Sequence, residues 1–328
     1  RAAWRGASSE RRGIMIGPVS TLDDLNHIRE ALGQVIHGKA AVLDLLLTGV
    51  VAAGHVLIED VPGVGKTTLA KALARAFTTT FTRVQFTPDL MPADILGGQV
   101  LNPREGSFTF QRGPIFTNVL LADEINRASP RTQSALLEAM NEAQVTVDGV
   151  THALPQPFFV LATQNPAGAA GTYPLPEAQL DRFLLRIAVG YPDEGAELRM
   201  LYSHRLRDPI LDLRAVTTPE RLLALQADAR AVEVREPVAR YLLQIVAATR
   251  GTPDIELGVS PRGSLALLRA AQARALLAGR SYVSPADIQA LCAPVLAHRL
   301  QLTPHARYSG QGPEAFLDSI VRALPVPT

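Results

Sequence analysis

Apolar residues change their spacing along this chain. In residues 21–54 they recur at helical spacing, whereas in residues 56–189 short apolar runs alternate with helical segments, at 56–59, 82–86, 118–122, 158–163 and 184–189. Such runs, separated by helices, are typical of strands buried on both faces of a parallel sheet. Beyond residue 192 the strand pattern nearly stops and helical segments continue to the end. The pattern predicts an α/β fold with a five-stranded parallel sheet in residues 20–192, an all-helical domain in residues 193–328, and a flexible tail in residues 1–19, which lack periodicity.

Four helix starts are marked by a hydroxyl residue followed by proline. The pairs begin at Ser129, Thr218, Ser260 and Ser284, and each precedes a run rich in leucine and alanine. A hydroxyl at the N-cap accepts a hydrogen bond from the first turn, and proline is favoured at the first helical position. We therefore expect a helix after each pair.

The turn after the first predicted strand carries the strongest chemical signal. Residues 55–67 read His-Val-Leu-Ile-Glu-Asp-Val-Pro-Gly-Val-Gly-Lys-Thr, and a helical run follows. A strand, a glycine-rich turn and a helix form a phosphate cradle, in which a lysine reaches the β- and γ-phosphates and a hydroxyl binds Mg²⁺. In an ordinary turn, Lys66 would sit at a helix N-terminus, where the dipole disfavours a cation by roughly 0.3–1 kcal/mol. The candidate nucleotide-binding residues of this turn are Pro62, Gly63, Val64, Gly65, Lys66, Thr67 and Thr68.

One position departs from the strict phosphate-turn pattern. The first glycine of Gly-x-x-x-x-Gly-Lys-Thr is replaced by Asp60. The groups that touch phosphate are all present, so we expect this residue to alter the conformation of the turn without abolishing binding.

Two further predicted strands end in polar residues suited to nucleotide hydrolysis. The run at 118–122 is followed by Asp123 and Glu124, which would hold Mg²⁺ and act as the general base, respectively. The run at 158–163 is followed by Asn165, placed to hydrogen-bond the γ-phosphate or the attacking water. Since Asn-Pro is also a frequent turn dipeptide, an ordinary turn remains the alternative for Asn165.

Two arginines occupy positions that suit an anion. Arg262 lies in the first turn of the helix expected after Ser260, where a cation is disfavoured unless an anion is near. Arg182 lies just before the last predicted strand, and a guanidinium is the group used against charge on a transferring phosphoryl. For each arginine taken singly, a surface salt bridge is the alternative.

Composition excludes several other classes. The chain is 47% hydrophobic and 19% charged with a net charge of +1, which gives no reason to expect nucleic acid or a membrane surface as partner. Its single cysteine, Cys292, excludes an internal disulfide. No apolar run reaches membrane-spanning length and no hydrophobic segment follows the basic N-terminus, so we expect no membrane insertion and a cytoplasmic location.

From about residue 32 onward the chain resembles the AAA+ ATPases, and within them the MoxR family of the helix-2-insert clade. The resemblance rests on the motifs at residues 59–67, 122–128, 161–166, 176–183 and 260–262. It implies ATP and Mg²⁺ as cofactors. It further implies that Lys66 and Thr67 belong to the Walker A motif, that Asp123 and Glu124 belong to the Walker B motif, and that Asn165 is sensor 1. By the same resemblance, Arg182 is an arginine finger that reaches a neighbouring subunit, and Arg262 is sensor 2 on a helical lid. Val35 and Ile36 are then the residues that pack on adenine.

Two segments with alternating patterns predict hairpins. Residues 97–112 contain a Gly/Asn/Pro centre, and residues 145–152 contain Asp148-Gly149, a common hairpin turn. They resemble the helix-2 insertion and the hairpin before sensor 1, which project toward the pore in ring-shaped members. Solvated hairpins with no partner are the alternative.

The resemblance implies an ATP hydrolase that forms a homo-oligomeric ring, a hexamer, and remodels a protein client. It also implies chaperone-like maturation, often metal cofactor insertion, and a partner with a von Willebrand factor A domain. A nucleic-acid motor of the same clade is the alternative, and the few basic residues in the two hairpins count against it. A small-molecule kinase or a GTPase is also disfavoured, because neither class explains the sensor and lid motifs. A nucleotide-binding scaffold that does not hydrolyse ATP is disfavoured because the candidate general base, Glu124, is present.

Overall fold

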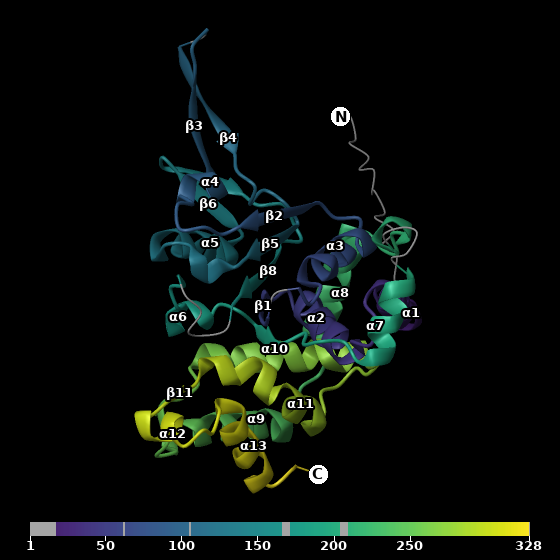
Figure 1. Ribbon diagram of the computed structural model, residues 1–328. Coiled ribbons are helices and arrows are strands. Elements are labelled where there is room, and N and C mark those ends of the chain that lie inside the picture. The colour runs from purple at the N-terminus through teal and green to yellow at the C-terminus, as the bar shows by residue number, and fades with distance from the viewer. Residues whose placement is uncertain (1–17, 62, 105, 166–170, 204–208, 328) are drawn as a thin grey trace, which may run out of the picture.

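The computed structural model describes residues 18–327 except 62, 105, 166–170 and 204–208 (Figure 1). Its centre is a parallel sheet of five strands in the order β2–β5–β8–β1–β9. All five predicted strands are confirmed, with small shifts at their ends. The strands are β1 (Val56–Glu59), β2 (Phe81–Gln85), β5 (Val119–Asp123), β8 (Phe159–Gln164) and β9 (Leu185–Ile187).

Alternate side chains of these strands enter two different hydrophobic clusters. In β1, Val56 and Ile58 pack in the cluster that includes α1 (Pro18–Val35), α2 (Ala40–Val51) and α3 (Lys66–Ala76). Leu57, between them, packs in the cluster on the other face, which includes α5 (Pro130–Glu142) and α4 (Pro92–Leu96). Since successive side chains of a strand point to opposite faces, continuous apolar runs require helices on both faces.

The register of the sheet brings the strand ends together at one edge. Gln85 of β2 pairs with Asp123 of β5, and Glu59 of β1 pairs with Gln164 of β8. Ligands of open α/β sheets bind outside the carboxyl ends of their strands. The residues predicted to bind nucleotide follow these ends.

Both predicted hairpins are confirmed. β3 (Gly97–Asn102) pairs with β4 (Ser107–Arg112). This hairpin projects away from the sheet on the side opposite to α12 (Pro304–Tyr308) and α13 (Pro313–Ala323) (Figure 1). β6 (Gln144–Val147) pairs with β7 (Val150–Ala153) across Asp148 and Gly149, whose φ angles are 50° and 78°. The ring of Phe110 stacks on that of His152 at 4.0 Å, so the two hairpins touch.

Among the described residues after β9, helices dominate, as predicted, apart from one short antiparallel pair of strands. The helices that follow α6 (Glu177–Leu180) are α7 (Glu194–Ser203), α8 (Pro219–Ala231), α9 (Glu236–Gly251), α10 (Pro261–Leu277), α11 (Pro285–Leu296), α12 (Pro304–Tyr308) and α13 (Pro313–Ala323). Three 3₁₀ turns, η1 (Ile125–Arg127), η2 (Pro209–Asp212) and η3 (Ala297–Arg299), and the pair β10 (Ile255–Leu257) and β11 (Gln301–Leu302) complete the described elements.

The four helix starts marked by a hydroxyl and proline are confirmed. The hydroxyls of Ser129, Thr218 and Ser260 each accept an N–H of the first turn, and Ser284 forms a capping box with Asp287. α1 begins at Pro18, and most of the tail expected in residues 1–19 lies outside the described residues.

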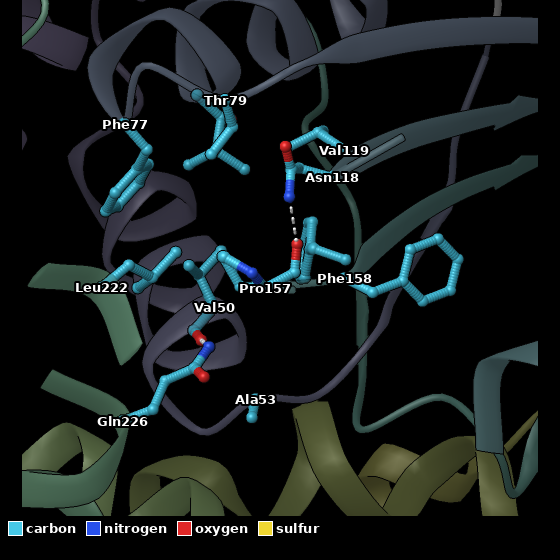
Figure 2. Close-up of a pocket in the computed structure, with 12 residues that line it drawn as sticks. Val50, Ala53, Phe77, Thr79, Asn118, Val119, Pro157, Phe158, Leu222 and Gln226 are labelled. Atoms are coloured by element: carbon cyan, nitrogen blue, oxygen red, sulfur yellow. Dashed lines mark hydrogen bonds between the residues drawn. The ribbon is translucent and has the colours of Figure 1, made fainter. Parts of the chain in front are cut away.

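The helical part packs directly on the sheet domain. Leu222 of α8 lies beside Val50 and Phe77, and the Gln226 amide nitrogen donates to the carbonyl of Val50 at 2.8 Å (Figure 2). One hydrophobic cluster therefore runs from α1 to α13. Within the described residues, every helix is too short or too polar to cross a bilayer.

Candidate active site

The phosphate turn, residues 60–65, links the end of β1 to α3. Gly63 and Gly65 have φ angles of 87° and 88°, a region that is costly for residues with a Cβ. Gly65 is also the N-cap of α3, so the helix starts at Lys66 with its first N–H groups directed toward the turn. Pro62 lies outside the described residues. The glycines of the sequence motif are thus required by the backbone of an anion-binding turn.

Lys66 is held between the turn and the acid pair. Its ammonium donates to the main-chain carbonyl of Asp60 at 2.7 Å. Burial lowers the pKa of Lys66, and the nearby charges of Asp60, Asp123 and Glu124 oppose that shift. A lysine poised in this way is available to the phosphates of a bound nucleotide.

A cavity of about 390 Å³, the phosphate cavity, gathers the predicted phosphate and metal residues. It is lined by both glycines of the turn, by Thr68 and by Lys66, Thr67, Asp123, Glu124 and Asn165. The Thr67 hydroxyl and the Asp123 carboxylate would supply oxygen ligands, which Mg²⁺ prefers. With a lysine and an N-terminal helix turn in the same cavity, the residues present fit a Mg²⁺–nucleotide complex.

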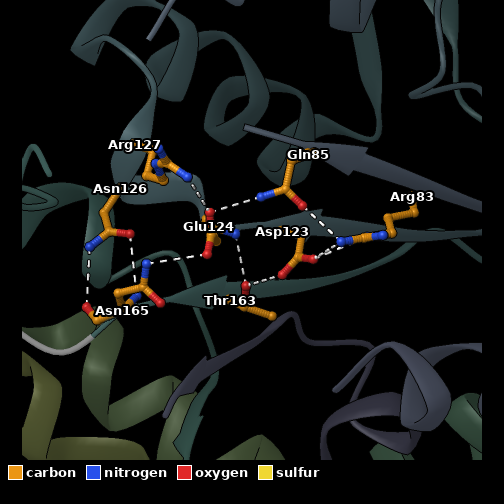
Figure 3. Close-up of polar contacts among 8 residues, drawn as sticks. All are labelled: Arg83, Gln85, Asp123, Glu124, Asn126, Arg127, Thr163 and Asn165. Carbon is orange, nitrogen blue, oxygen red and sulfur yellow. Dashed lines mark hydrogen bonds and ion pairs between the residues drawn. The ribbon is translucent and has the colours of Figure 1, made fainter. Parts of the chain in front are cut away.

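Asp123 has a hydrogen-bond partner on each carboxylate oxygen (Figure 3). Oδ1 accepts the Thr163 hydroxyl at 2.6 Å, and Oδ2 accepts Nε and Nη2 of Arg83 at 3.0 and 2.7 Å. The Thr163 hydroxyl oxygen also accepts the main-chain N–H of Glu124 at 2.8 Å. Thr163 of β8 therefore fixes the acid pair at the end of β5.

Glu124 is held at both oxygens and adopts an unusual backbone conformation. Its φ is 56°, which is uncommon for a residue with a side chain and is enriched at functional sites. Oε2 accepts from Gln85 at 2.9 Å and from Arg127 at 3.0 Å, and Oε1 accepts from the Asn165 amide at 3.4 Å (Figure 3). This network aims a carboxylate into the phosphate cavity beside Asn165, as a general base requires.

A second cavity of about 390 Å³, the base cavity, adjoins the first. Val35 and Ile36, the two residues expected to contact adenine, line it, and so does Val64. Gly63, Gly65 and Thr68 line both cavities. Residues 189–192, which lead from β9 toward α7, form another wall. An apolar chamber joined to a phosphate cradle matches the two ends of a nucleotide.

Arg182 and Arg262 lie together in a third cavity of about 300 Å³, the arginine cavity. Neither lines the phosphate cavity of its own chain. The Nη1 of Arg182 donates to the carbonyl of Leu137, while its buried Nε has no hydrogen-bond partner among the described residues. Arg262 donates to the side chain of Asn141 on α5. The structure thus brings the two predicted arginines to each other, and not to the other site residues.

Sequence reasoning missed several residues of the site, among them Thr163 and Arg127, which hold the acid pair. Arg83 and Gln85 alternate along β2 and reach Asp123 and Glu124 from the neighbouring strand. Two polar residues at a spacing of two in an otherwise predicted strand are the signal that could have identified them. Asp60 was noted only as a departure from the motif, whereas its carboxylate accepts the N–H groups of Val61, Val189 and Gly190.

Comparisons with known proteins cover both domains. Residues 55–185 match the ATPase family associated with various cellular activities (AAA), and residues 247–320 match the AAA lid domain. YeaC of Bacillus subtilis is 49% identical over 298 residues, which are 91% of this chain and 93% of YeaC. The chaperone MoxR1 of Mycobacterium tuberculosis is 41% identical over 303 residues, 90% of this chain and 80% of MoxR1.

A solved structure agrees with these matches. A crystal structure of a protein from Cytophaga hutchinsonii superimposes with a TM-score of 0.87 at 34% sequence identity, covering 95% of this chain and 97% of the other. The site geometry and the relatives point the same way: the chain belongs to the MoxR family of AAA+ ATPases, which are ATP hydrolases.

Proposed function

We propose that this protein hydrolyses ATP at the interfaces of a homo-oligomeric ring, a hexamer, and uses the energy to remodel a protein client. The observation that carries the proposal is the position of Arg182 and Arg262. Both line one cavity and neither lines the phosphate cavity of its own chain. Among the described residues, Arg182 donates to a main-chain carbonyl and Arg262 to a side-chain amide, and neither is paired with a carboxylate. Two such cations in one cavity suit an anion supplied from outside the chain.

Each residue of the phosphate cavity has a separate role in ATP hydrolysis. Lys66 neutralises the β- and γ-phosphates, and Thr67 and Asp123 hold Mg²⁺, which supplies positive charge against the phosphate oxygens. Glu124 accepts the proton of the attacking water, while Asn165 orients that water or the γ-phosphate beside it. Gln85 and Arg127 fix the Glu124 carboxylate in place. Val35 and Ile36 pack on adenine.

The arginines act on the nucleotide of the next subunit. Arg182 serves as the arginine finger and Arg262 as sensor 2, and together they stabilise charge on the transferring phosphoryl. An isolated subunit would bind ATP but turn it over slowly.

We further propose chaperone-like work in the cytoplasm, such as maturation or metal cofactor insertion, with a partner that carries a von Willebrand factor A domain. The relative named as a chaperone supports this class of activity. The β3–β4 hairpin, which exposes Val100, Leu101 and Phe108, suits contact with a polypeptide. Its exposed apolar side chains favour a protein client over the nucleic acid of the alternative motor.

Subunit mixing tests hydrolysis at interfaces. Arg182→Ala should bind ATP nearly normally and lose turnover by about 10³-fold, the usual scale for an arginine finger. Lys66→Ala should fail to bind ATP but retain an intact Arg182. A mixture of the two should recover turnover, because one variant supplies the nucleotide site and the other the arginine. With subunit exchange verified by labelled chains, no recovery at any mixing ratio would disprove catalysis between subunits.

A further inference from the structure

Arg299 lies inside the protein beside the segment that carries Arg182. Its side chain is 3% exposed. Nη2 donates to the carbonyls of Asp181 and Phe183, and Nη1 donates to the carbonyl of Leu184 at 3.3 Å. A guanidinium offers five N–H donors in a rigid fork. Three carbonyls that flank Arg182 on both sides are thus held by one buried side chain.

Asp181 connects this segment to the helix that carries Arg262. One oxygen of its carboxylate accepts the Nε of Arg299 at 2.7 Å, and the other accepts the hydroxyl of Ser260 at 3.3 Å. Ser260 is the N-cap of α10, and Arg262 lies in the first turn of that helix. A single carboxylate therefore bridges the two segments on which the arginines of the arginine cavity stand.

The first turn of α10 also packs on Arg299 itself. A Cβ built on Gly263 would lie 2.4 Å from Cγ1 of Val259, too short for a side chain, and 3.0 Å from Cδ of Arg299, tighter than most contacts of a Cβ. Glycine at this position lets the helix approach Arg299 closely. Residues 181–184, 260–263 and 297–299 accordingly meet at one guanidinium.

We propose that Arg299 is a positioning residue that, with Asp181, fixes Arg182 and Arg262 relative to each other. The two arginines then meet the phosphates of a neighbouring subunit's nucleotide as one preformed unit. This inference rests on the proposed catalysis between subunits. It assigns to the helical domain a task beyond carrying Arg262: through η3, that domain sets the position of the arginine finger.

The charge of Arg299 is consistent with this role. Burial lowers the pKa of Arg299 to about 10, and the carboxylate of Asp181 opposes the shift. Arg299 therefore remains a cation at neutral pH and can keep both its donors and its ion pair. Its own N–H groups are turned toward main-chain carbonyls, Asp181 and the ring of His298, so it orders the arginine cavity without offering those donors to a ligand.

Two substitutions separate positioning from simple support of the fold. Arg299→Lys keeps the charge, but a single ammonium cannot bind the three carbonyls and Asp181 together. Asp181→Asn keeps the shape and an acceptor for Ser260 but removes the ion pair, and it decides the question if Arg299→Lys does not fold. The matched controls are Arg280→Lys and Asp287→Asn, which alter another ion pair of the helical domain, joined at 2.7 Å, whose aspartate is 3% exposed.

Turnover, ATP affinity and subunit mixing are the readouts. Arg299→Lys and Asp181→Asn should lose turnover by about 10²-fold, the scale for a misplaced catalytic group, while the Kd for ATP stays close to that of the unmodified protein. Mixing either with Lys66→Ala should restore turnover, because the partner supplies an intact pair of arginines. The two controls should retain turnover in the folded protein.

Three results would overturn the positioning role: unchanged turnover in both variants, a loss of ATP affinity that matches the loss of turnover, or controls that are equally impaired. A fourth would be failure of the Arg299 and Asp181 variants to recover in mixtures in which Arg182→Ala does recover. If Arg182→Ala itself does not recover, catalysis between subunits is what fails. In that case the unmixed Arg299→Lys and Asp181→Asn variants decide the positioning role: a loss of turnover with an unchanged Kd for ATP supports it, and a matching loss of ATP affinity overturns it.

Discussion

Asp60, in the phosphate turn, accepts the main-chain N–H of Val189 at 2.6 Å, although the two residues are 129 positions apart in the chain. The same carboxylate oxygen accepts the N–H of Gly190, and the other accepts that of Val61 at 2.8 Å. Val189 and Gly190 form a wall of the base cavity and lead toward the helical domain. Where many phosphate turns have a glycine, this protein therefore has a link between its phosphate turn and its base cavity.

Replacing Asp60 should weaken ATP binding and lower the stability of the fold. Asp60→Ala removes a buried carboxylate that accepts three main-chain N–H groups, and hydrogen bonds to charged groups contribute about 1.5–3 kcal/mol each. We expect a lower free energy of unfolding and about tenfold weaker ATP binding, equivalent to about 1.4 kcal/mol, because the wall of the base cavity loses its anchor. Chemical denaturation and titration calorimetry with ATP measure the two effects.

Asp94→Ala is the matched control for Asp60→Ala. The Asp94 carboxylate also accepts a main-chain N–H, that of Met91 at 2.8 Å, but it lies outside both nucleotide cavities. It should lower stability and leave ATP affinity unchanged. Equal ATP affinities in the two variants would show that Asp60 only stabilises the fold.

Glu124→Gln should separate ATP binding from hydrolysis. The amide keeps the size of the side chain but cannot accept the proton of water, so turnover should fall by about 10²-fold or more. ATP binding should persist, because Lys66 and Thr67 are untouched. Steady-state phosphate release and ATP titration test both statements. Glu138→Gln, at an exposed position of α5, is the control, and wild-type turnover in Glu124→Gln would assign the base to another group.

Arg83 should compete with Mg²⁺ for Asp123. Its guanidinium occupies Oδ2 of Asp123 at 2.7 Å, yet its side chain is 47% exposed, so the pair is worth no more than about 1 kcal/mol. Arg83→Ala should lower the Mg²⁺ concentration that gives half-maximal turnover by up to about fivefold. The exposed Arg131→Ala serves as control for the change of net charge. A raised KM for ATP with an unchanged Mg²⁺ requirement would instead place Arg83 on the phosphates.

Much of the site could be predicted because its residues are local to strand ends. Asp123 ends a buried strand and Lys66 and Asn165 come after one, and parallel strands present their carboxyl ends at one edge. The sheet, both hairpins and the four proline-marked helix starts follow from spacing and turn chemistry in the same way. These features depend on a few neighbouring residues.

Contacts made across the fold could not be predicted from such local patterns. The partners of Asp60 lie after β9, and Arg299 meets Asp181 across 118 positions of the chain. The sequence placed Arg262 at a helix start but did not indicate which cavity that helix would face. Packing of α10 on the segment before β9 decides this, and it places Arg262 beside Arg182 and not at its own phosphate cavity.

His55 should make the protein sensitive to mild acid. It is buried at the start of β1, where Nε2 donates to the carbonyl of Met140 at 2.9 Å and Nδ1 accepts the N–H of Val160 at 3.0 Å. Only the neutral ring can do both. Burial accordingly lowers the pKa of His55 from 6.5 to about 4, while the bond to Met140 opposes the shift.

The sign of the effect follows from this lowered pKa. The unfolded chain binds a proton near pH 6.5 and the folded protein only near pH 4, so the stabilisation by neutral His55 is complete above pH 6.5 and is lost as the pH falls through 4. The free energy of unfolding should therefore decrease by roughly 3 kcal/mol between these values. Urea denaturation at a series of pH values measures it. His55→Gln should flatten the slope and the exposed His305→Gln should not; an equally steep slope in His55→Gln would assign the acid sensitivity to other groups, the buried His298 first among them.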